Sequence, residues 1–193
     1  METIDFGPST AELARIVRGV RDDQLKDPTP CPAYTVADLL DHVGGLAVAF
    51  RASARKEPLP GEPNPLGDGS RLEEAFRARI AGDLDALAEA WREPTAYDGL
   101  TKAGPIEMPA EVAALVALNE VVVHGWDLAR STGQDHAPDE AAALASLAFA
   151  ESFEVPDDAP DGGPFGPPVP VPDDAPAMDR LAGATGRDPA WTP

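Results

Sequence analysis

The sequence predicts an all-α protein: an antiparallel up-down four-helix bundle with an extra helix and a Pro-rich C-terminal tail. Helix breakers, among them most of the 22 prolines, gather in the segments 23–34, 57–69, 93–108 and 155–176. The stretches between these segments repeat apolar residues with the period of an α-helix. No segment alternates polar and apolar residues with a period of two between hairpin turns, so the prediction contains no strands.

Each of the first three predicted helices begins at a hydroxyl residue. Ser9 followed by Glu12 is typical of a capping box, in which the two side chains bond each other's backbone N–H groups. Thr35 can cap the second helix, and Ser70 with Glu73 opens the third. Behind each cap, apolar residues recur three and four positions apart and form one stripe: Leu13, Ile16, Val17 and Val20; Val36, Leu39, Leu40, Val43, Leu46 and Phe50; Leu72, Phe76, Ile80, Leu84, Leu87 and Trp91.

The later helices are predicted to begin at prolines. Pro109 suits the first turn of a fourth helix, which runs to about Arg130 and ends before Gly133. Pro138 begins a fifth helix that continues through an Ala-rich stretch to Phe153. A short sixth helix is predicted at 177–184.

We expect one domain, because 193 residues fit a single hydrophobic core. Residues 1–155 form the predicted helical bundle. Residues 156–193 form a Pro/Gly-rich strap and the short C-terminal helix, packed on the same domain. The breaker segment 155–176 is therefore expected to lie across the bundle.

Composition excludes several classes of function. The chain has 34 acidic and 15 basic side chains, a formal charge of −19, which argues against nucleic-acid and anionic-membrane partners. The single Cys31 excludes an internal disulfide and a multi-thiolate zinc site. The N-terminal residues show no signal-peptide pattern, and the apolar stretch 112–126 is interrupted by Glu120 and His124 and is too short to span a bilayer. A cytoplasmic protein is expected.

Three polar residues lie on apolar helix faces. His42 falls on the stripe of the second helix, three residues after Leu39. Glu120 and His124 are four apart, so their side chains share one otherwise apolar face of the fourth helix. Burying an unpaired carboxylate costs several kcal/mol, and a divalent metal would remove that cost. Two imidazoles and a carboxylate are a common zinc set. The alternative is a local Glu120–His124 hydrogen bond with His42 as a core histidine.

Two segments resemble the signatures of a known superfamily. They are TPCPAYTVADLLDHVGG (29–45) and NEVVVHGWDLARSTG (119–133), and both are similar to segments of DinB-like proteins. Within this superfamily, they most resemble the mycothiol-dependent maleylpyruvate isomerase N-terminal type and its short, single-domain metal-binding relatives. The tail 165–191 resembles the ending of those short relatives. The resemblance implies a helical bundle with a zinc-type site whose ligands are His42, Glu120 and His124.

Two departures from the family are visible. Tyr34 stands where many relatives have tryptophan, and we expect a mild effect. The isomerase bundle is followed by a second domain that contributes to its active site, and we expect no counterpart here.

The implied function is a metal-binding protein, with zinc as the first choice, that acts as a thiol-dependent transferase or isomerase on a small electrophile. Mycothiol is the candidate co-substrate. Asp127, one turn beyond His124, is a candidate acceptor that orients the imidazole, or else a solvated carboxylate. A non-catalytic metal-binding or regulatory bundle is the alternative, and a metal hydrolase is third. No catalytic residue is assigned, and a monomer or homodimer is expected.

Three other residues are given structural roles. Trp126 is expected to pack between helices. Cys31, between two prolines and with no adjacent histidine, is expected to be a structural thiol. His136 is expected to be solvated near a helix start.

Overall fold

The computed structural model describes residues 3–59, 66–153 and 165–193. It is mostly helical, as predicted, and it also contains a small two-stranded sheet. The elements are α1 (Gly7–Gly19), α2 (Val36–Arg55), α3 (Phe76–Trp91), β1 (Leu100–Ala103), β2 (Ile106–Pro109), α4 (Ala110–Thr132), α5 (Glu140–Glu151) and α6 (Ala177–Ala184). Short 3₁₀ turns occupy Asp22–Gln24, Gly69–Arg71 and Pro94–Tyr97.

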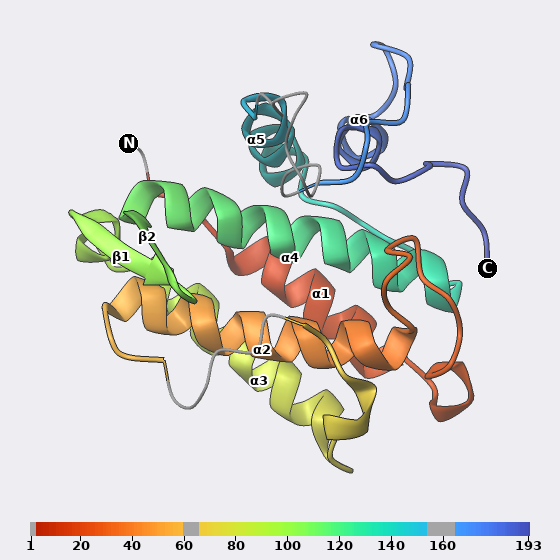
Figure 1. The fold of residues 1–193 in the computed structure, drawn as a ribbon, viewed down its shortest axis with the longest axis horizontal. Helices are drawn as coiled ribbons and strands as arrows, with labels where there is room; N and C mark the ends of the chain where they lie inside the picture. Colours follow the sequence, from red (N-terminus) through yellow and green to blue (C-terminus); the bar gives the residue numbers. More distant parts are fainter. Residues whose placement is uncertain (1–2, 60–65, 154–164) are drawn as a thin grey trace.

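The first four helices enclose the main core. α2 packs against α3 and α4, and α1 packs against the same two helices. α5 contacts α4, and α6 contacts α5, so this pair lies on the side of α4 away from α2 and α3 (Figure 1). The largest fully buried side chains come from α1–α4, α6 and the segment before α1: Trp91, Phe6, Leu13, Ile16, Leu39, Leu40, Ile80, Leu84, Leu87, Leu118, Leu128 and Leu181.

The start of α2 is as predicted, and the start of α1 is not. Thr35 caps α2 in a reciprocal capping box with Asp38. α1 begins at Gly7, earlier than expected, with Pro8 in its first turn and no side-chain cap. Ser9 is therefore inside the helix and buried, and no partner is found for its hydroxyl among the described atoms. Glu12 does not reach back to Ser9; it bonds Arg15 instead.

The third helix begins later than predicted. Ser70 lies in the 3₁₀ turn Gly69–Arg71, where the side chain of Asp68 accepts a bond from its N–H group. Regular helix starts only at Phe76. Because both the N–H and the hydroxyl group of Ser70 donate to Asp68, they stabilise the turn and do not begin a helix.

The later helices follow the prediction closely. α4 begins directly after Pro109 and ends at Thr132, two residues beyond the expected position, where Gly133 takes the left-handed conformation at φ 63°. α5 begins at Glu140 after its Asp139 cap, two residues after the predicted Pro138, and ends at Glu151, two residues before the predicted Phe153. α6 has the predicted bounds.

Part of the predicted strap lies outside the described residues. The residues not described are 154–164, so the predicted boundary between bundle and strap at residue 155 stays a prediction. Residues 165–176 form no helix or strand and are joined to the C-terminal helix by a bond from the Val169 N–H group to the Gly183 carbonyl.

The hairpin between α3 and α4 contradicts the strand-free prediction. β1 and β2 pair antiparallel, with Leu100 opposite Pro109 and Ala103 opposite Ile106. Gly104, at φ 60°, occupies the first position of the two-residue turn, where glycine is favoured in hairpins. Each strand has only four residues, which is too short for a clear alternating pattern.

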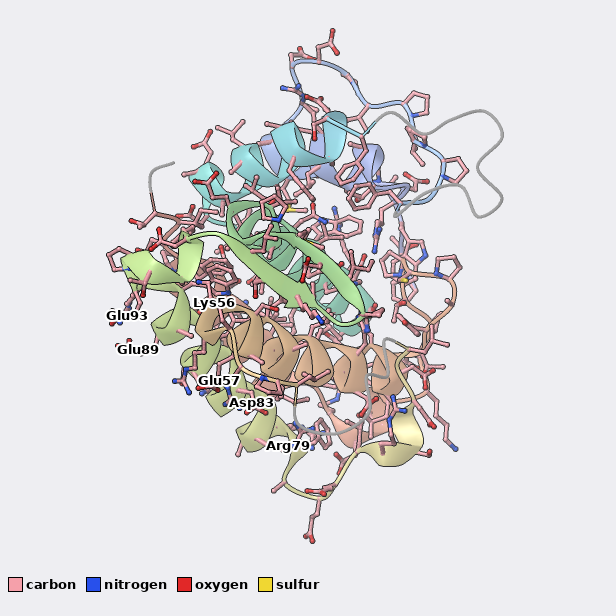
Figure 2. The ribbon with its side chains drawn as sticks, turned by 60° about the vertical axis from the view of Figure 1, so that its left-hand side comes forward. Lys56, Glu57, Arg79, Asp83, Glu89 and Glu93 are labelled. Atoms are coloured by element: carbon pink, nitrogen blue, oxygen red, sulfur yellow. The ribbon has the colours of Figure 1, made fainter. Side chains whose placement is uncertain are left out.

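The surfaces of α3 and α4 differ. Charged side chains follow the outside of α3 and the end of α2, among them Arg79, Asp83, Glu89, Lys56 and Glu57 (Figure 2). α4 is long and apolar enough to cross a membrane by length and composition, contrary to the expectation for 112–126. Because 78% of its most apolar window is buried, its apolar residues serve as core.

Candidate metal centre

The packing of α2 against α4 brings the three predicted ligands together. His42 comes from α2, and Glu120 and His124 come from one face of α4. Nε2 of His124 lies 3.0 Å from Oε2 of Glu120, and Nε2 of His42 lies 3.7 Å from the same oxygen. The two imidazole rings meet edge to face, with centroids 5.1 Å apart. The carboxylate of Glu120 is therefore held between two imidazole nitrogens.

Asp127 fixes the orientation of the His124 ring. Its side chain is fully buried, which excludes the solvated carboxylate left open by the sequence. Its Oδ2 lies 2.9 Å from Nδ1 of His124. Because Nδ1 is occupied by Asp127, Nε2 is the nitrogen that faces Glu120 and His42. Burial alone would lower the pKa of His124, but the hydrogen bonds and charges of Asp127 and Glu120 raise it to about 9.

The pKa values of the two carboxyl groups are shifted in the opposite sense. Burial would raise the pKa of Glu120, but the adjacent imidazoles of His124 and His42 outweigh it and hold the pKa well below its ordinary value. Asp127 behaves in the same way, since His124 and Arg187 lower the pKa of its carboxyl against the effect of burial. Both groups are therefore carboxylates at neutral pH.

Arg187 is the residue of the site that the sequence analysis missed. Its guanidinium donates to both oxygens of Asp127, with Nε 3.2 Å from Oδ1 and Nη2 3.0 Å from Oδ2. It comes from the segment after α6, 60 residues beyond Asp127. Its only signal was its place in the tail 165–191, and no local pattern connects it to α4.

The three ligand residues fit a divalent ion. One ligand atom from each lies within 4.8 Å of the other two. Ligands at about 2.0–2.2 Å from a tetrahedral zinc ion are roughly 3.4 Å apart, so modest side-chain rotations would complete the set. Among the described residues no other group of three His, Cys, Asp or Glu side chains meets this spacing.

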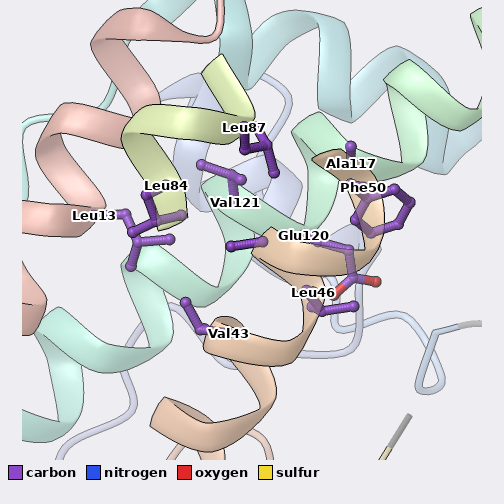
Figure 3. A pocket seen from close by; sticks show the side chains of 10 residues that line it. Leu13, Val43, Leu46, Phe50, Leu84, Leu87, Ala117, Glu120 and Val121 are labelled. Carbon is purple, nitrogen blue, oxygen red and sulfur yellow. The ribbon is translucent and has the colours of Figure 1, made fainter. Parts of the chain in front are cut away.

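Aromatic and apolar residues of α2 and the loop before it surround the set. The ring of Tyr34 packs on His42 at a centroid distance of 5.2 Å, and its hydroxyl accepts a bond from the Gly67 N–H group. On the other side, Glu120 borders an apolar cavity with Leu46 and Phe50 (Figure 3). With a volume of about 10 Å³, this cavity accommodates little more than a water molecule.

The remaining candidates stay outside the ligand set. Cys31 is partly buried, and burial raises the pKa of its thiol, which agrees with a structural role. Trp126 is buried as expected. His136 is half-buried rather than solvated; it lies just before the cap of α5 and lines a small cavity with Ser9 and Gly125.

Two imidazoles and a carboxylate on facing helices define a candidate metal centre of the kind found in helical bundles. The sequence profile of the mycothiol maleylpyruvate isomerase N-terminal domain family matches residues 6–129. The chain belongs to this family.

Relatives and solved structures agree with this assignment. The uncharacterized proteins Rv0738 and MT0763, from two strains of Mycobacterium tuberculosis, are each 33% identical over 176 residues, 91% of this chain and 91% of theirs. Crystal structures of the mycothiol-dependent maleylpyruvate isomerase and of a histidine-to-alanine variant share the fold over 76% of this chain, with TM-scores of 0.53 and 0.57 and 20% identity. The match spans 65% of each isomerase chain.

Proposed function

We propose that the protein binds a divalent metal, zinc as the first choice, at His42, Glu120 and His124, and uses it in a thiol-dependent isomerase or transferase reaction on a small electrophile. The convergence of these three side chains from α2 and α4 is the observation that carries the proposal. Membership of the isomerase family supports mycothiol as the thiol. We also propose the antiparallel DinB-like four-helix bundle and a cytoplasmic location.

Each residue of the centre has a distinct task. His124 presents Nε2 because Asp127 binds its Nδ1. His42 presents its own Nε2 from α2, with its ring packed against Tyr34. Glu120 contributes the single negative charge of the ligand set. With one carboxylate among these three residues, a bound divalent ion would keep one net positive charge and would supply the Lewis acidity that lowers the pKa of a thiol or water ligand.

The metal is tested by elemental analysis of protein purified without chelator. The wild-type protein is expected to hold about one divalent ion per chain, and His42→Ala and Glu120→Ala are expected to lose it, because two remaining ligands bind weakly. His136→Ala is the matched control, since His136 lies outside the ligand set. Wild-type protein that stays metal-free after reconstitution with zinc, nickel, iron and manganese would contradict the proposal.

The chemistry is tested with metal-loaded protein, mycothiol and a panel of small electrophiles that includes maleylpyruvate. Turnover that requires both the metal and the thiol, and that is lost in His124→Ala, is the expected result. Metal binding without any turnover would favour the non-catalytic metal-binding or regulatory protein. Turnover independent of thiol would favour a metal hydrolase.

A further inference from the structure

Arg187, in the C-terminal segment, holds the carboxylate of Asp127, which in turn contacts the imidazole of His124. Besides its two bonds to Asp127, Arg187 donates from Nη1 to the Thr185 carbonyl at 2.8 Å. Its side chain is only 12% exposed, and that of Asp127 is not exposed. A buried guanidinium with three hydrogen bonds is fixed in position, and so is the carboxylate that it holds.

The backbone after α6 is built to present Arg187. The N–H group of Arg187 bonds the Ala182 carbonyl at 2.8 Å, and that of Gly186 bonds the Gly183 carbonyl at 3.0 Å, which closes the end of the helix. Gly186 has φ 82° and packs directly on Gly166: a Cβ at this position would lie 2.8 Å from the Gly166 Cα. The turn therefore depends on glycine twice, once for its conformation and once for this contact.

Asp127 connects this turn to the centre. Its Oδ2 accepts from Arg187 Nη2 at 3.0 Å and contacts His124 Nδ1 at 2.9 Å. The other nitrogen of the same ring, Nε2, lies 3.0 Å from Glu120. An unbroken series of polar contacts thus runs from the C-terminal turn to the metal-ligand set.

We propose that Arg187 is a positioning residue for the metal centre, so that docking of the C-terminal segment on α4 determines metal affinity. This inference rests on the metal site proposed above. Without Arg187, Asp127 would be a buried carboxylate with one partner fewer, and it would turn away from His124. This change frees the His124 ring. Loss of partners that orient metal ligands typically lowers metal affinity by about 10–100-fold.

The test measures zinc affinity, by competition with a chromophoric chelator, for wild-type protein and for Arg187→Ala, Arg187→Lys and Arg130→Ala. Arg130 is the matched control because it also joins α4 to the C-terminal segment, through Pro189 O at 2.9 Å, but no bond connects it to Asp127. The visible spectrum of the Co²⁺-loaded proteins reports ligand geometry independently of activity. Circular dichroism establishes that each variant is folded.

We expect Arg187→Ala to bind zinc about 10–100-fold more weakly and to show an altered Co²⁺ spectrum. Guanidinium ion at millimolar concentration should restore part of the affinity. Arg187→Lys should stay weak because an ammonium cannot bind both oxygens of Asp127 in the same way. Arg130→Ala should bind within about threefold of wild type, as expected for a contact with no connection to the ligands. Arg187→Ala with wild-type affinity and spectrum would overturn the inference.

A second comparison tests the inference if Arg187→Ala does not fold. Asp127→Asn/Arg187→Ala removes both buried charges and is therefore expected to fold. It is expected to bind zinc as weakly as Asp127→Asn, because Arg187 acts through Asp127. A further loss of affinity in the double variant would overturn the inference. Absence of zinc binding by the wild-type protein would instead defeat the proposed metal site itself.

Discussion

The carboxylate of Asp38 joins the start of α2 to a distant loop. It accepts bonds from the Thr35 N–H and hydroxyl groups and from the Gly69 N–H group at 2.8 Å. The hydrogen bond from Thr35, followed by that from Gly69, lowers the pKa of Asp38 below its ordinary value. Because the folded state prefers the ionised form, its contribution to stability is complete above the unfolded-state pKa and is lost as pH falls through the folded-state pKa.

Asp38→Asn should therefore lower the free energy of unfolding by about 1 kcal/mol at pH 7, a typical value for a lost cap. The difference from wild type should shrink below about pH 3.9, the ordinary pKa of Asp. Urea unfolding at a series of pH values measures both effects. Asp85→Asn, on the exposed surface of α3, is the control. A difference that is constant down to the lowest pH at which the protein folds would contradict the assignment.

At the residue scale, helical periodicity places His42, Glu120 and His124 on apolar faces, and the structure brings these three side chains together. That they bind a metal stays a prediction. Their neighbours were less predictable. Asp127 follows from its spacing to His124, but its complete burial and its pairing with Arg187 depend on the tertiary fold. Arg187 reaches it only through the tertiary fold, so no pattern within the sequence indicates the pair.

At the scale of elements, two of the three hydroxyl residues predicted to begin helices, Thr35 and Ser9, make opposite contributions. Thr35→Ala should lower the free energy of unfolding by about 1 kcal/mol, because it removes a real cap. Ser9→Ala should raise it by about 0.5–1 kcal/mol, because it removes a buried hydroxyl without a described partner and introduces a better helix former. Thermal or urea unfolding of both variants provides the comparison. Equal losses would restore Ser9 as a cap.

The errors at this scale have two physical causes. The start of a helix depends on local groups near its first turn. At α1, Pro8 lies in the first turn and the helix begins before Ser9. At Ser70, the side chain of Asp68 accepts the hydrogen bond from the Ser70 N–H group. The hairpin escaped prediction because its strands are short, although Gly104 followed by proline between Ala103 and Ile106 was a usable turn signal. The start of α2 was predicted correctly at its Thr35 cap, and α4 was predicted to within two residues at its end.

At the scale of the whole molecule, zinc should stabilise the fold, because its ligands come from two helices that separate on unfolding. Free zinc at 100 times its Kd should add about 2.7 kcal/mol. For a chain of this size that corresponds to a rise in Tm of about 5–10 °C. Differential scanning fluorimetry with a zinc titration measures the shift, and Glu120→Gln is the control with a ligand removed. An equal shift in wild type and in Glu120→Gln would contradict a specific site.

The placement of Glu120, His124, Asp127 and Arg130 on α4 also limits how the length of the chain can vary. They follow one another at intervals of four, three and three residues, and each residue of a helix turns the next by about 100°. One residue inserted or deleted between 120 and 127 would rotate the orienting carboxylate away from Glu120 by about 100°. The loop after Gly133 is not helical, so a change in its length does not rotate these side chains. Relatives that keep the metal-ligand set should therefore differ in length in this loop and not within this stretch of α4.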